Sequence, residues 1–120
     1  MEIVVESPQD MNLLGLFIKE ALDARRDALA RSRATGSIGL TAGTMSVTLS
    51  FEPDRTVIHK GIVGSPKAQL TGSLESLVAI ARGRIAPTLL SRRARISGNP
   101  MAALPLARVF RSDAPLRSGR

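Results

Sequence analysis

The residue types that most often carry catalysis are few and scattered in this 120-residue chain. It has one histidine, His59, and no cysteine, so a zinc site of Cys and His ligands or a thiol nucleophile is excluded. Glu52 and Asp54 stand two residues apart around Pro53, which is typical of an exposed hairpin tip. The sequence contains neither a Gly-x-Ser-x-Gly elbow nor the Gly-Lys-Ser/Thr of a phosphate-binding loop. We therefore expect no enzyme activity, no catalytic or metal-ligating residue and no cofactor.

The charge is concentrated toward the C-terminal end of the chain. The formal net charge is +7, but residues 1–75 carry 8 basic and 9 acidic side chains, whereas residues 76–120 carry 9 basic side chains and one acid. Such a basic surface suits a nucleic acid or an anionic membrane. The only aromatic residues are three Phe, so the chain is poor in the stacking platforms that bind single strands. We expect no specific nucleic acid as a partner, and a basic nucleic-acid-binding module stays open as an alternative function.

The first third of the chain is predicted to form a long helix, which would position any site residues in this segment. Residues 9–32 have helical spacing with apolar side chains over about half of the helical wheel, and Ser7-Pro8 resembles a helix start. Arg25 interrupts the apolar half, either as a side chain that reaches solvent at the helix end or as a cation at the rim of a pocket. Residues 2–5 are β-branched and suggest an edge strand before this helix.

The middle of the chain changes to a period of two, which is typical of strands. Strands are predicted over residues 37–41, 45–51, 57–62 and 68–71, and a fifth over 93–97. Since short turns join the first four, we expect an antiparallel meander. Ser73 is expected to cap a helix over residues 73–82.

A last helix, predicted over residues 99–111, is apolar on nearly every side. It is expected either to cover a lipid cavity as a lid or to complete the core or a dimer interface, so a structural, scaffold or dimerisation protein is a further alternative. We predict one domain over residues 1–111 and a disordered tail over 112–120. The acidic N-terminal segment is unlike a signal peptide and the apolar runs are too short to span a membrane, so a cytoplasmic location is expected.

Several short motifs in residues 67–110 occur in an order that carries a family resemblance. A strand ends in Thr71-Gly72, a helix starts with Ser73-Leu74 and continues to Leu77, Gly83 and Pro87 follow, and Ile96-Ser97-Gly98 precedes the helix from Asn99. In this order the chain resembles the SCP2-like (sterol carrier protein 2) family. It departs from that family at Arg92, where Gly is frequent, and in ending with Ser-Gly-Arg instead of the peroxisomal Ser-Lys-Leu.

The resemblance implies both a fold and a function. The fold would be α/β (α+β), with a five-stranded, mostly antiparallel sheet and helices on one side. The function would be non-catalytic binding and transfer or presentation of an apolar lipid (a sterol, fatty acid or isoprenoid) in an internal hydrophobic cavity.

The expected site residues follow from that fold. A lipid ligand is expected to contact apolar side chains of the second strand, the middle helix, the Pro87 turn and the lid: Met45, Val47, Leu49, Phe51, Leu77, Ile80, Leu89, Leu90, Met101, Leu104, Val109 and Phe110. Four arginines are expected near the lid, where each would add about 1 kcal/mol of attraction to an anionic membrane surface or lipid headgroup: Arg92, Arg93, Arg108 and Arg111.

Overall fold

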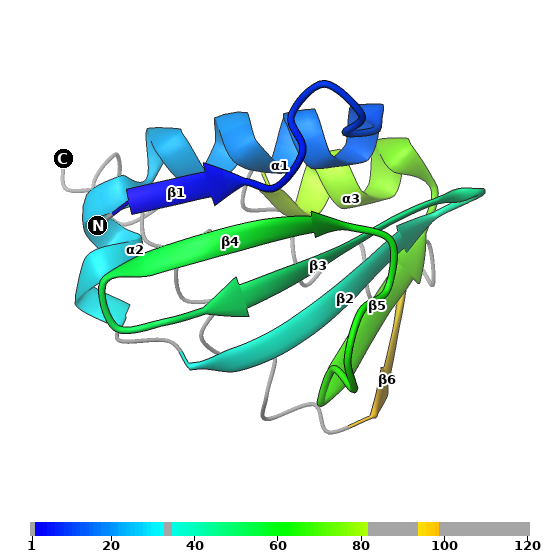
Figure 1. Ribbon diagram of the computed structural model, residues 1–120. Coiled ribbons are helices and arrows are strands. Elements are labelled where there is room, and N and C mark those ends of the chain that lie inside the picture. The colour runs from blue at the N-terminus through cyan, green and yellow to red at the C-terminus, as the bar shows by residue number, and fades with distance from the viewer. Residues whose placement is uncertain (1, 33–34, 82–93, 99–120) are drawn as a thin grey trace, which may run out of the picture.

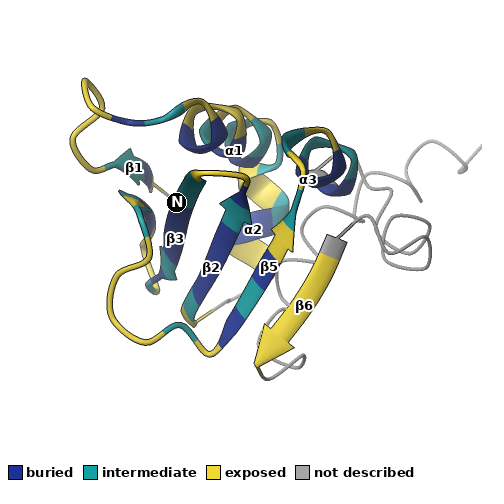
Figure 2. Cartoon of the chain, turned by 90° about the vertical axis from the view of Figure 1, so that its right-hand side faces the viewer, coloured by how far each residue is buried: buried dark blue, intermediate teal, exposed yellow. Residues whose placement is uncertain are grey.

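The computed structural model describes residues 2–32, 35–81 and 94–98, which form one sheet with helices on one side (Figures 1 and 2). The strands are β1 (Glu2–Val5), β2 (Gly36–Ala42), β3 (Met45–Phe51), β4 (Arg55–Lys60), β5 (Ala68–Gly72) and β6 (Ala94–Gly98), and the helices are α1 (Leu13–Ala24), α2 (Arg26–Ser32) and α3 (Leu74–Ala81). The strand order is β1-β4-β3-β2-β5-β6. The predicted α+β class with helices on one side is confirmed.

The number of strands differs from the prediction, since the sheet has six strands and not five. The additional strand is β1, the predicted edge strand, which pairs in parallel with β4 so that Ile3 lies opposite Thr56. Backbone hydrogen bonds hold both ends of β1: the amide of Glu2 donates to the carbonyl of Asp54 at 3.1 Å, and the amide of Glu6, just after the strand, donates to the carbonyl of Ile58 at 2.9 Å.

The predicted meander is right for β2, β3 and β4 and wrong for β5. The first three strands are antiparallel neighbours, but β5 pairs in parallel with β2 instead of with β4. The connection over residues 61–67 is held to β3 by Thr48, whose hydroxyl donates to the carbonyl of Gly61 at 2.8 Å and accepts from the amide of Val63 at 3.0 Å. Gly39 makes room for this connection, because a Cβ there would lie 2.9 Å from Cδ1 of Ile62.

The predicted helix over residues 9–32 starts later than expected and is divided in two. Ser7 has a positive φ of 53° and belongs to a turn. The N-cap of α1 is Asn12 instead, whose Oδ1 accepts from the amide of Gly15 at 2.9 Å and whose Nδ2 donates to the carbonyl of Ser46 in β3 at 3.0 Å. The helix then stops at Ala24, and Arg25 (φ −121°, ψ 32°) separates it from α2.

The third helix agrees with the prediction, since Oγ of Ser73 accepts from the amide of Ser76 at 3.0 Å and caps α3. The fifth predicted strand is β6, shifted by one residue, and it pairs with β5. The predicted Pro87 turn, the terminal helix over residues 99–111 and the tail over residues 112–120 lie outside the described residues.

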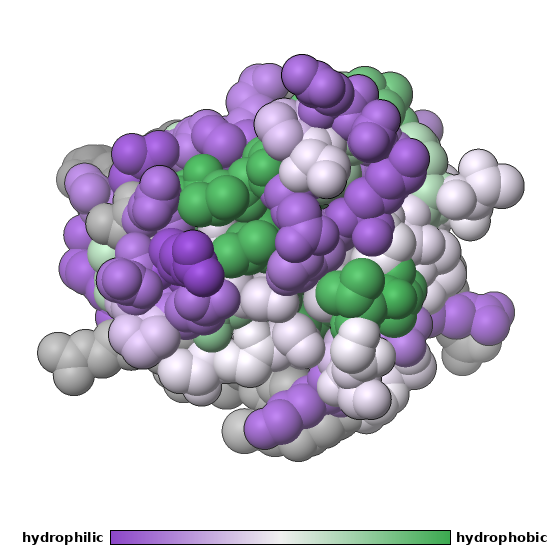
Figure 3. Space-filling view, viewed as in Figure 1, coloured by the Kyte–Doolittle hydropathy of each residue, from purple (hydrophilic) through white to green (hydrophobic). Residues whose placement is uncertain are grey.

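The hydrophobic core lies between the sheet and the helices (Figure 2). Alternate residues of β3 face this side, as shown by Cγ1 of Val47, which lies 3.3 Å from where a Cβ on Gly15 of α1 would be. The opposite side of β2 and β3 carries mostly hydroxyl side chains: Ser37, Thr41, Ser46, Thr48 and Ser50. In the view of Figure 3, hydrophilic residues divide the hydrophobic surface into separate patches.

Candidate functional site

An apolar groove of about 210 Å³ lies between α1 and α3. Both helices lie on the same side of the sheet (Figure 2). The groove is lined by seven apolar and two charged residues: Leu14, Phe17, Ile18, Ala21, Ala24, Leu77 and Val78, with Glu20 and Arg25. Its lining is therefore mostly apolar with a few charged groups, a composition that is common in ligand pockets.

The wide apolar arc of α1 forms one wall of this groove. Leu14 and Ile18 point into the core, and their side chains are at most 4% exposed. Phe17 lies on the same apolar arc but is 39% exposed. Ala21 and Ala24 continue the wall with small side chains, and longer side chains there would fill the groove. The helix therefore has more apolar surface than its contact with the sheet covers.

Arg25 contributes a cation to this apolar lining. Its Nε is buried, and its backbone is fixed at both ends: its amide donates to the carbonyl of Leu22 at 3.0 Å and its carbonyl accepts from the amide of Leu29 at 2.9 Å. Of the two interpretations of Arg25 that the sequence allowed, this placement agrees with a cation at a pocket.

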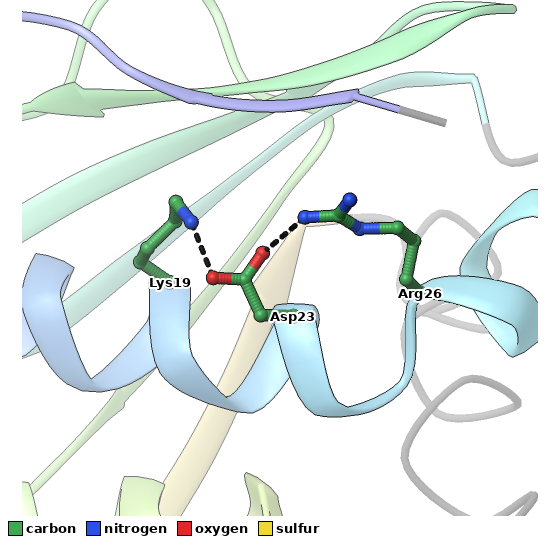
Figure 4. Close-up of polar contacts among 3 residues, drawn as sticks. All are labelled: Lys19, Asp23 and Arg26. Carbon is green, nitrogen blue, oxygen red and sulfur yellow. Dashed lines mark hydrogen bonds and ion pairs between the residues drawn. The ribbon is translucent and has the colours of Figure 1, made fainter.

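A three-residue charge cluster spans the junction between α1 and α2 (Figure 4). The carboxylate of Asp23 accepts through Oδ2 from Nζ of Lys19 and through Oδ1 from the guanidinium of Arg26 at 2.8 Å. The hydrogen bond from Lys19, with a further contribution from Arg26, holds the pKa of Asp23 below its usual value. The carboxylate therefore stays ionised at neutral pH and ties the end of α1 to the first residue of α2.

The predicted site residues that are described fall mostly in the core. Those of β3 and α3 belong to one buried cluster (Val47, Leu49, Phe51, Leu77 and Ile80), and Met45 is half-buried against it. Among them, Leu77 lines the groove. The other predicted site residues lie outside the described part of the chain: Leu89, Leu90, Met101, Leu104, Val109 and Phe110, together with Arg92, Arg93, Arg108 and Arg111.

Sequence reasoning missed the groove residues of α1 and one of α3. Four of them, Phe17, Ala21, Ala24 and Val78, line the groove but are not among the predicted lipid contacts. The available signal was the breadth of the apolar arc on α1, which exceeds the narrow stripe that one helix–sheet contact needs.

The single histidine, His59, contacts a carboxylate of a neighbouring segment. Its Nδ1 lies 3.1 Å from Oε1 of Glu6, which joins β4 to the segment after β1. In residues 2–32, 35–81 and 94–98, His, Asp and Glu side chains form no group of three or more that could hold a metal ion. None of the helices described is long and apolar enough to cross a membrane.

Comparison with known structures shows the same fold in several proteins. The sterol carrier protein domain 2 of Helicoverpa armigera has a TM-score of 0.64 and 18% identity, covering 97% of this chain and 95% of that one. Palmitated SCP2L2 from Aedes aegypti has a TM-score of 0.63 and 18% identity, covering 83% of this chain and 95% of that one. A protein described as "UbiJ-SCP2 Ubiquinone synthesis protein" has a TM-score of 0.62 and 11% identity, covering 82% of this chain and 93% of that one.

The sequence comparisons add the family. No curated protein matches the chain. The model of the SCP-2 sterol transfer family matches residues 16–111, which include α1 from its fourth residue on, α2, the strands β2 to β6 and α3. The chain therefore belongs to the SCP-2 sterol transfer family.

Proposed function

We propose that this protein binds an amphipathic lipid without chemical change and transfers or presents it, with the lipid chain in the groove between α1 and α3. The observation that carries the proposal is an apolar groove whose lining contains a cation, Arg25. The family is described as one of sterol transfer, one structural neighbour as palmitated and another as a ubiquinone synthesis protein. These descriptions support the three lipid classes expected from the sequence: sterols, fatty acids and isoprenoids.

The floor of the proposed site is the hydrophobic core itself. Leu14, Ile18 and Leu77 belong both to the groove lining and to the buried core cluster. The predicted residues of β3 lie in the same cluster, so in this proposal they support the floor and contact a chain that reaches deeper. Removing apolar ligand surface from water there is favourable by about 25 cal/mol per Å².

The size of the groove limits how much of a lipid it holds. Sites for drug-sized ligands usually measure about 300–1,000 Å³, whereas this groove measures about 210 Å³. The groove therefore suits part of a lipid chain. We expect the rest of the lipid chain to contact the predicted lid and turn residues: Leu89, Leu90, Met101, Leu104, Val109 and Phe110.

Arg25 gives the groove a preference among lipids. A guanidinium forms charge-assisted, bidentate hydrogen bonds with a carboxylate or phosphate, and these are stronger where water is excluded. Glu20, an exposed residue of the same lining, repels any anion near it, so in this proposal the headgroup lies beside Arg25 and away from Glu20. The groove therefore favours a lipid with one anionic headgroup, such as a fatty acid, over an uncharged analogue of the same chain length.

Displacement of a fluorescent fatty acid by palmitate or by hexadecanol tests both parts of this proposal. Ala24→Phe puts a large side chain into the groove, and Ala30→Phe makes the same change at an exposed position of α2 outside it. If the new ring excludes about 55 Å² of lipid surface, affinity falls about tenfold in the first variant, and it is unchanged in the second. Arg25→Gln should weaken palmitate and spare hexadecanol, whereas Arg31→Gln, at the end of α2, should affect neither.

Two results would overturn the proposal. One is the absence of saturable displacement together with no co-purified lipid in native mass spectrometry. The other is an equal effect of the two Phe substitutions. Nanomolar binding to RNA or DNA that weakens steeply with salt would favour the nucleic-acid alternative instead, and a symmetric dimer without lipid affinity would favour the scaffold alternative.

A further inference from the structure

We infer that Asp23 is a positioning residue for Arg25, and that through it the α1–α2 junction sets the preference for anionic over uncharged lipid. This inference rests on the proposed function, because it assigns a cause to the orientation of the cation in the groove.

The junction determines where the side chain of Arg25 leaves the backbone. Arg25 is the single residue between α1 and α2, with a φ of −121° that departs from helical geometry. Its hydrogen bonds to Leu22 and from Leu29 fix the peptide groups on both sides. Leu29 is fully buried and anchors α2 in the core. A change in the angle between the helices therefore changes the direction in which the Arg25 side chain leaves the backbone.

Asp23 links the two helices across this junction, on the side of α1 that faces away from the groove. One carboxylate oxygen binds Lys19 within α1, and the other binds Arg26, the first residue of α2. Neither Lys19 nor Arg26 lines the groove, whereas Arg25, between Asp23 and Arg26 in the chain, does. Asp23 thus has no direct route to a lipid in the groove, and its influence passes through the geometry of the junction.

Two effects of removing the Asp23 charge oppose each other. Removing a negative charge near the groove reduces electrostatic repulsion and so raises the affinity for an anionic lipid. Loosening the α1–α2 junction lowers that affinity, because Arg25 is no longer held in place. Asp27→Asn separates them, because Asp27 lies in the first turn of α2 but has no part in the cluster around Asp23. The electrostatic effect alone leaves palmitate binding unchanged or slightly tighter in that control.

The test compares palmitate with hexadecanol in the full chain by the same displacement assay. In Asp23→Asn, palmitate should bind about two- to fivefold more weakly, the range expected for an exposed ion pair, while hexadecanol should bind as before. Arg26→Gln should reproduce this loss, because it breaks the link across the junction. Asp23→Glu should recover most of the palmitate affinity. Thermal denaturation of each variant checks that it is folded.

A double-mutant cycle with Arg25 decides whether the effect passes through the cation. In an Arg25→Gln background, Asp23→Asn should have no further effect on palmitate. A persistent or equal loss for both lipids would mean that Asp23 merely stabilises the fold, which overturns the inference. If Arg25→Gln removes the palmitate preference and Asp23→Asn does not, the inference is wrong and the proposed function stands. If Arg25→Gln leaves the preference intact, the headgroup proposal itself is wrong.

Discussion

Gly98, the last residue of β6, offers a sharp test of the sheet geometry. It lies opposite Ala68 of β5 with a φ of +83°. A Cβ at this position would lie 2.5 Å from the carbonyl oxygen of Lys67 and 3.1 Å from Cα of Ala68. Both are backbone atoms at the start of β5, so they cannot move aside as the end of a flexible side chain does. We therefore expect Gly98→Ala to destabilise the protein through two separate effects.

The size of each effect follows from the geometry. Placing an L-residue at positive φ costs about 1–2 kcal/mol, and forcing a methyl group into a packed position adds about 1–3 kcal/mol. Gly61→Ala is the matched control, because Gly61 has a φ of +80° and a Cβ there would have no atom of the described residues within 4 Å. The control should show only the first cost, so the two variants should differ by about 1–3 kcal/mol in the free energy of unfolding.

Urea denaturation followed by circular dichroism measures this difference as a shift in midpoint at constant slope. Hydrogen exchange should show the largest loss of protection in the β5–β6 pair for Gly98→Ala and none there for Gly61→Ala. Equal losses of stability in the two variants would refute the close approach of β6 to β5. The same contact gives a physical reason for glycine at the end of the Ile-Ser-Gly motif of the sequence.

Three further predictions concern other contacts of the fold. Thr48→Val should lower the free energy of unfolding by about 1–3 kcal/mol, because it leaves the Gly61 carbonyl and the Val63 amide without their hydroxyl partner; a loss below 0.5 kcal/mol would contradict this. Asn12→Ala should lower it by about 1–3 kcal/mol, since both the α1 cap and a bond to β3 are lost, and Asn12→Asp, which keeps the cap acceptor, should lose less. The pKa of Asp23 is lowered in the folded protein, so ionised Asp23 stabilises the fold. Asp23→Asn should therefore have a lower free energy of unfolding than the unmodified protein above the unfolded-state pKa of about 3.9. This difference should disappear as the pH falls through the lower folded-state pKa. Urea titrations from pH 7 to pH 2 check the sign, and a difference that grows on acidification would refute it.

Local patterns predicted the elements that form within a short stretch of chain. The alternation over residues 45–51 placed Val47, Leu49 and Phe51 on one face, and that face is the core. Ser73 was expected to cap a helix and does so. The helical wheel also singles out Arg25 as a charged residue within an apolar arc, and Arg25 lines the groove.

The alternation and turns of the sequence by themselves therefore determined the antiparallel pairing of β2 with β3 and of β3 with β4, and the side of β3 that is buried, because period and turn chemistry act between near neighbours. The class of fold followed from the resemblance to the SCP2-like family. Only the tertiary structure decided that β5 joins β2, that Asn12 begins α1 and that α1 and α3 enclose a groove. Each of these depends on contacts between distant segments, such as the hydrogen bond from Asn12 to Ser46 in β3. A contact of this kind leaves no periodic signal in either segment, so it becomes visible only when the chain is folded.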